Sequence, residues 1–169
     1  MPHPVYKILA QRLDSIPNGF PATESGIELK LLAKIYTPEQ AALAAEMRLT
    51  PEGAVAIAAR VGWEPAAAYS ALKNMARNGL IRTHRGEREL RFGLMPFVVG
   101  VYEAQLARMD EEMARLFEAY FQESFGREVL SATPSLHRII PVEQSIALDI
   151  EVFPYERASQ LLEGARSFG

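Results

Sequence analysis

The sequence predicts a mainly α-helical fold with a small β component. Helix start and stop signals recur along the first half of the chain, and apolar residues recur at helical spacing over residues 96–126. Between these regions lie two short strand-like runs that flank a charged turn. The chain is 49% hydrophobic and 23% charged, which is typical of a globular protein with a packed core. Its 169 residues suffice for one domain or for two small ones.

Two short helices are expected in the amino-terminal region. After a turn rich in proline and glycine, Ser25 and Glu28 have the spacing of a capping box, so a helix should begin there with Ser25 as its N-cap. This helix should stop near Tyr36. Thr37 and Pro38 then begin the next helix, because proline is well tolerated at the first helical position.

Two further helices are expected close together after residue 50. Residues 50–52 repeat the threonine–proline start signal, and the helix that follows should end at Gly62. Residues 63–65 open a second helix, which should end at Gly79. Three residues separate the two helices, as in a helix-turn-helix. The second helix should bury Ala68, Ala71, Leu72 and Met75.

A short hairpin is expected directly after these helices. Residues 80–83 and 89–92 are strand-like, and residues 84–88 form a charged tip that contains a turn glycine. The order of helix, turn, helix and hairpin over residues 51–95 resembles the winged helix-turn-helix family. We therefore expect residues 1–95 to be a helical lead-in plus this winged helix.

The remainder of the chain is expected to form a long helix and an α/β tail. Residues 96–126 should form one linking or dimerisation helix, and residues 127–169 a strand or arm and a terminal helix. The apolar stripe of the long helix has two interpretations: it packs on its own domain, or it pairs with the same helix of a second subunit. The stripe comprises Val98, Tyr102, Leu106, Met109, Met113, Leu116 and Tyr120.

The candidate contact surface lies on the second helix of the helix-turn-helix and on the hairpin. Residues 52–95 carry seven basic and four acidic side chains, whereas residues 96–169 carry six and twelve. A basic island in an acidic chain favours a polyanion or an acidic partner. Ala66 and Ala67 lead the helix and are too short for base contacts, so strong DNA sequence readout is not expected. The contact residues are expected to be Tyr69, Ser70, Lys73, Asn74, Arg77, Arg82, Arg85 and Arg88, with Arg91 adding to the basic hairpin.

The sequence lacks residues that several classes of function require. The chain contains no cysteine, so it can form neither a disulfide nor a thiolate metal site. The histidines at 3, 84 and 137 lack metal-ligand spacing, and the glycines form no phosphate-binding motif. We expect no enzyme activity and no cofactor in this chain. No apolar run approaches a membrane span and no signal pattern opens the chain, so a cytoplasmic location is expected.

Five stretches carry a broader resemblance, namely residues 13–29, 36–40, 96–103, 137–142 and 154–156. Together they resemble the amino-terminal region of a bacterial family of 4Fe-4S ferredoxin-type proteins, in which a winged-helix region precedes a cysteine-rich cluster domain. In that family the segment similar to the last five residues here is followed shortly by the first cysteines. The resemblance implies 4Fe-4S clusters in a longer parent protein, whereas this cysteine-free chain carries no cluster ligand.

Three hypotheses of function follow from these observations. The leading one is a non-catalytic, dimeric winged-helix module at the amino terminus of an iron-sulfur electron-transfer protein, which docks a protein redox partner. The alternative is a DNA-binding transcriptional regulator. A third is a small-molecule sensor with an apolar pocket between the winged helix and the long helix, which would use Trp63 or Tyr102.

Overall fold

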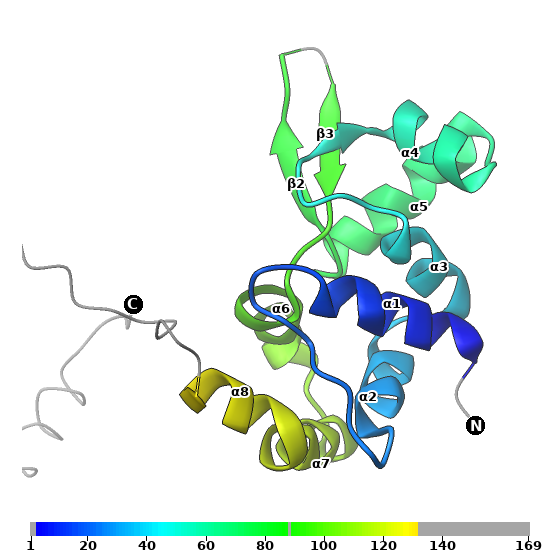
Figure 1. Cartoon of the computed structure of the whole chain (residues 1–169). Coiled ribbons are helices and arrows are strands. Elements are labelled where there is room, and N and C mark those ends of the chain that lie inside the picture. The colour runs from blue at the N-terminus through cyan, green and yellow to red at the C-terminus, as the bar shows by residue number, and fades with distance from the viewer. Residues whose placement is uncertain (1–2, 88, 132–169) are drawn as a thin grey trace, which may run out of the picture. The chain divides into compact units, whose positions relative to one another are not determined.

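The computed structural model describes residues 3–87 and 89–131 (Figure 1). All of them lie in one compact unit, Met1–Leu136. This unit is mainly helical and contains a small three-stranded antiparallel sheet. The strand or arm and the terminal helix expected after residue 131 lie outside the described residues.

Three helices precede the sheet: α1 (Pro4–Asp14), α2 (Ile27–Ile35) and α3 (Pro38–Ala45). The predicted end of α2 and start of α3 are confirmed. The Thr37 hydroxyl accepts the N–H of Gln40 at 3.3 Å, and the Gln40 side chain accepts the N–H of Thr37 at 3.0 Å. This reciprocal capping box satisfies two backbone donors that the helix itself leaves unpaired.

The predicted capping box at the start of α2 is wrong, and the helix begins one residue later than expected. Gly26 rather than Ser25 is the N-cap residue, and the N–H of Ile27 is donated to the Thr23 hydroxyl at 3.1 Å and to the Ser25 hydroxyl at 3.3 Å. Glu28 does not reach back to the backbone as a capping box requires, since its buried carboxylate accepts the Thr23 hydroxyl. The Ser25 hydroxyl donates instead to Glu123, at 2.6 Å.

The next two helices are α4 (Ala54–Val61) and α5 (Pro65–Arg77), and the predicted three-residue connection between them is confirmed. Gly62 and Gly79 both have a φ of +69°, the left-handed conformation that suits a residue after a helix end. The predicted start at residues 50–52 is wrong: α4 begins at Ala54, because the two residues before it belong to the sheet.

The sheet consists of β1 (Glu52–Gly53), β2 (Arg82–Arg85) and β3 (Leu90–Gly93), with β3 in the centre. The β2–β3 hairpin confirms two antiparallel strands after α5, although β2 begins two residues later than expected. Leu80 and Ile81 are buried before the strand starts, so their apolar character reflects burial in the core.

The single long helix predicted over residues 96–126 is wrong. The chain forms an irregular turn over Phe97–Val101, α6 (Tyr102–Gln105), a short 3-10 turn over Leu106–Arg108, α7 (Glu111–Tyr120), a π-type stretch over Phe121–Phe125 and α8 (Gly126–Ser131). The break lies at Asp110, whose carboxylate caps α7 by accepting the N–H of Met113 at 2.8 Å. Lys34 holds the same carboxylate at 2.8 Å, so a contact with α2 fixes the break.

The apolar stripe of this region packs largely within the chain, the first of its two interpretations. Met113 and Tyr120 are buried, and Tyr102 stacks on Phe117 with ring centroids 3.7 Å apart. Leu106 is the exception at 54% exposure. The homodimer stays a prediction, and a continuous dimerisation helix is not available to form it.

Two buried tyrosine hydroxyls tie the amino-terminal helices together and to the segment after α5. The Tyr36 hydroxyl donates to the carbonyl of Leu80 at 3.0 Å, and the Tyr6 hydroxyl donates to the carbonyl of Tyr36 at 2.9 Å. A buried hydroxyl needs such a partner, because an unpaired one would be costly. These bonds fix the chain after α5 against the lead-in helices.

Alkaline pH should destabilise this fold. Burial raises the pKa of Tyr36 and of Tyr120 far above the usual value, so in the folded state both stay protonated where an unfolded tyrosine ionises. The contribution of these tyrosines to stability should be constant below about pH 10, and above it stability should fall by about 1 kcal/mol per pH unit for each of them. Urea unfolding at about pH 9 and about pH 11 measures the slope. Tyr36→Phe should have a shallower slope, and an unchanged slope would contradict this cause.

Candidate docking surface on helix α5 and the β2–β3 hairpin

Helix α5 has the two faces that the sequence predicts. Ala68, Leu72 and Met75 are fully buried. The opposite side is open to solvent and presents Ala66, Ala67, Tyr69, Ser70, Lys73, Asn74 and Arg77. The structure therefore brings all five predicted contact residues of this helix together on one exposed surface.

Contacts within the surface hold its central side chains in place. The Tyr69 ring is 40% exposed and meets the buried Phe92 ring edge-on, with centroids 5.9 Å apart. The Lys73 ammonium lies 5.8 Å from the centre of the Tyr69 ring, within cation–π range. Asn74 accepts a hydrogen bond from the Asn78 side chain at 3.0 Å, one turn further along. Tyr69 thus joins α5 to the sheet and supports the nearest cation.

The amino terminus of α5 is closed by its own carboxylate. Glu64 is the N-cap residue, and its Oε2 accepts the N–H of Ala66 at 2.7 Å and that of Ala67 at 3.2 Å. These donors would otherwise be free to bind an anion. This role of Glu64 was not predicted, although Pro65 at the first helical position identifies residue 64 as the cap.

The hairpin arginines divide between the two faces of the sheet. Thr83 pairs with Phe92 and Arg85 with Leu90, so Arg85 shares the face that meets Tyr69. His84 pairs with Arg91 on the opposite face, which Arg82 shares by alternation along the strand. Arg82 also donates to the carbonyl of Leu49 and lies at the base of the hairpin. Arg88 lies outside the described residues.

We define the docking surface as Tyr69, Ser70, Lys73, Asn74 and Arg77 together with Arg85. Within residues 3–87 and 89–131, Lys73, Arg77 and Arg85 form no ion pair. By contrast Lys34, Arg48, Arg60 and Arg115 are all paired with carboxylates. The cations of the docking surface are therefore available to a partner.

The described residues contain no cluster of histidine, aspartate and glutamate that could hold a metal ion. Within the same part of the chain, no helix is long and apolar enough to cross a membrane. Of the two residues named for a small-molecule sensor, Trp63 lines a groove together with residues of α1 and α3, whereas Tyr102 stacks on Phe117, and the sensor stays a hypothesis.

Comparison with known proteins yields no relative: no protein-family model matches the sequence, and no curated protein or solved structure is significantly similar to the chain.

Proposed function

We propose that this chain is a non-catalytic winged-helix module that docks an acidic protein partner through the surface defined above. The order of α4, a three-residue turn, α5 and the β2–β3 hairpin supports the winged-helix assignment. Tyr69 and Arg77 are exposed and belong to residue types that are enriched in protein interfaces, which supports the use of α5 for docking.

The observation that carries this proposal is the Glu64 carboxylate at the amino terminus of α5. In helix-turn-helix proteins that read DNA, the first residues of this helix approach the base edges, and phosphates favour the helix amino terminus. Here the Glu64 carboxylate already accepts two N–H groups of that terminus, so these donors are not available to a DNA phosphate. The cations of the docking surface begin two turns later, where they can meet carboxylates of a protein partner.

We further propose that the module belongs to a 4Fe-4S ferredoxin-like electron-transfer protein, as its sequence resemblance implies. Complexes between redox proteins are generally small and transient, and electrostatic attraction speeds their formation. Free cations beside an exposed aromatic ring suit such a complex. The partner of the parent protein would then be an acidic redox protein.

The parent gene tests the redox part of this proposal directly. Sequencing beyond the codon for Gly169 should reveal cysteines at ferredoxin-like spacing. The protein purified without oxygen should then bind iron and inorganic sulfide and absorb visible light. A stop codon at that position would contradict the redox assignment, whereas the docking surface would still need its own test.

Charge reversal tests the docking surface. In the parent protein, Lys73→Glu combined with Arg77→Glu should slow electron exchange with an acidic ferredoxin used as probe, by about tenfold at low ionic strength. High salt should reduce the difference, because it screens the attraction. Lys7→Glu with Lys30→Glu is the matched control, since both are exposed lysines away from α5. Equal rates for the two double variants would refute docking at this surface.

Duplex DNA is the second candidate partner, favoured by the unpaired cations of α5 and the hairpin. A regulator that neutralises six phosphates should lose roughly a thousandfold in affinity between about 50 and 200 mM salt. Fluorescence anisotropy with a labelled random duplex measures this slope. Binding that is unchanged after Lys73, Arg77, Arg85 and Arg88 are all replaced by alanine would exclude this surface as the DNA contact.

A further inference from the structure

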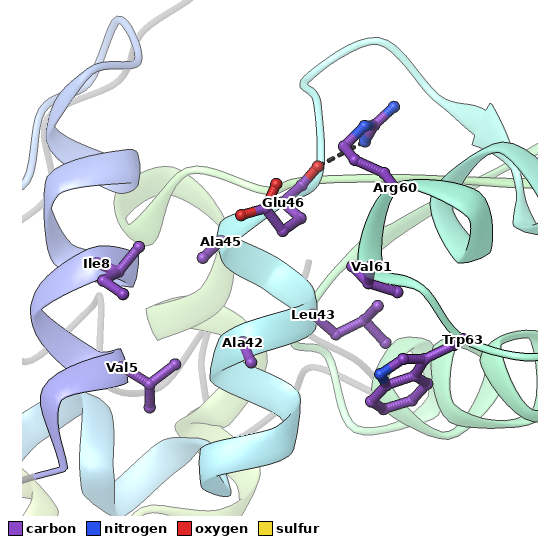
Figure 2. A pocket seen from close by; sticks show the side chains of 9 residues that line it. All are labelled: Val5, Ile8, Ala42, Leu43, Ala45, Glu46, Arg60, Val61 and Trp63. Atoms are coloured by element: carbon purple, nitrogen blue, oxygen red, sulfur yellow. Dashed lines mark hydrogen bonds between the residues drawn. The ribbon is translucent and has the colours of Figure 1, made fainter.

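A second surface, separate from the one on α5, is an open groove that crosses α3 (Figure 2). Its volume is about 350 Å³, and it is lined by α1, α3, the end of α4 and the α4–α5 turn. Figure 2 shows α3 between the two sides, with Ile8 of α1 on one side and Trp63 of the turn on the other. Ala42 and Ala45 of α3 form its floor.

The two sides of the groove expose large apolar side chains that the fold itself does not cover. Ile8 is 53% exposed and Trp63 is 36% exposed, whereas Leu43, which also lines the groove, is buried. Exposed apolar side chains that gather around one groove indicate an interaction site more strongly than scattered ones do. Small residues on the floor between larger sides let the backbone of an incoming helix approach α3 closely.

The charges along the groove indicate the sign of its partner. Arg60 is already engaged: one guanidinium nitrogen donates to the carbonyl of Glu46 at 2.5 Å, and another lies 2.6 Å from the Glu52 carboxylate. The Glu46 carboxylate also lines the groove, and it forms no ion pair within the described residues. Glu46 is therefore the charged lining residue of the groove that has no ion pair within residues 3–87 and 89–131.

We propose that this groove binds an amphipathic, basic helix of a partner protein. The helix places apolar side chains one turn apart against Ile8 and Trp63, and it sets a lysine or arginine beside Glu46. This mode of recognition uses a preformed groove and anchors at helical spacing. The surface is independent of the docking surface on α5, so the two can serve different partners.

Trp63 provides a direct measurement, because it is the single tryptophan of the chain. The probe is a synthetic helical peptide with leucines on one face and lysines on the other, and the comparison peptide has glutamate in place of each lysine. Neither contains tryptophan. The basic peptide should shift the Trp63 emission to shorter wavelength in a saturable manner, and it should bind at least about tenfold more tightly than the acidic peptide.

Substitutions then locate the binding site. Ile8→Asp should weaken binding of the basic peptide by about tenfold, whereas Leu106→Asp, at an equally exposed leucine, should change it less than about twofold. Glu46→Lys should reverse the preference between the two peptides. Ala42→Gln should also weaken binding, since it fills the floor without adding charge, and it replaces Ile8→Asp if that variant folds poorly.

The proposal is overturned by any of three results. The emission shift fails to saturate, both peptides bind equally, or Ile8→Asp and Leu106→Asp have the same effect. Because none of these variants alters the docking surface on α5, such a result would leave the proposed function untouched. Conversely, if the charge reversals on α5 have no effect, that result does not bear on the groove.

Discussion

Replacing Phe97 by alanine should lower the free energy of unfolding by about 3–5 kcal/mol, the typical cost of removing a fully buried phenylalanine. The ring lies 4.7 Å from Phe20 and 6.4 Å from both Tyr102 and Tyr120, centroid to centroid. It thus joins the loop before α2 to α6 and α7. The substitution removes packing from all of these segments at once and leaves a cavity that rigid neighbours fill only in part.

Urea unfolding followed by circular dichroism measures this loss. Val55→Ala is the control, because Val55 is 64% exposed on α4, and its change should stay within about 0.5 kcal/mol. A loss below about 1 kcal/mol for Phe97→Ala would mean that the aromatic cluster does not hold these segments together.

Gly79→Ala should cost about 2–4 kcal/mol, and Gly62→Ala about 1 kcal/mol, although both glycines have a φ of +69°. A Cβ at Gly79 would lie 2.5 Å from the Cβ of Ala104, so either α6 or the end of α5 must shift. A Cβ at Gly62 meets nothing within 4 Å and adds only the backbone strain. The difference between the two variants therefore isolates the packing of α6 on the end of α5.

The Gly79 variant should also disturb the polar contacts that close α5. The side chain of Gln105 donates to the carbonyl of Asn78 at 2.9 Å, and Arg108 donates to the Asn78 side chain at 3.0 Å. Thermal unfolding of both glycine variants gives the comparison. Equal destabilisation would show that strain alone acts at both positions and that the contact with Ala104 is easily relieved.

Local signals predicted the start of α3 and the ends of α4 and α5 correctly. Thr37, Gly62 and Gly79 act through the backbone of neighbouring residues, and such short-range effects can be read from a single sequence. The buried side of α5 was predictable for the same reason, since helical spacing alone separates Leu72 from Lys73.

Errors arose where distant residues decide the local structure. The helical spacing of residues 96–126 continues through Asp110, yet Asp110 caps a new helix and is held by Lys34, 76 positions earlier. Strand β1 has two residues and no periodicity, and only its pairing with β3 defines it. The groove over α3 draws on α1, α3, α4 and the turn that follows α4, so no local pattern in the sequence indicates it.

The arrangement of the sheet also affects the solubility of designed variants. Strand β2 lies at an edge, and its residues, Arg82 to Arg85, are all exposed. Backbone groups on an open edge can pair with a strand of another molecule, and charged side chains on edge strands oppose such pairing. Replacing Arg82 and Arg85 by alanine would therefore remove two charges that oppose aggregation, and at Arg85 it would also remove a cation of the docking surface. Glutamate at these positions changes the sign of the charge while keeping the edge repulsive, so it separates loss of binding from loss of solubility.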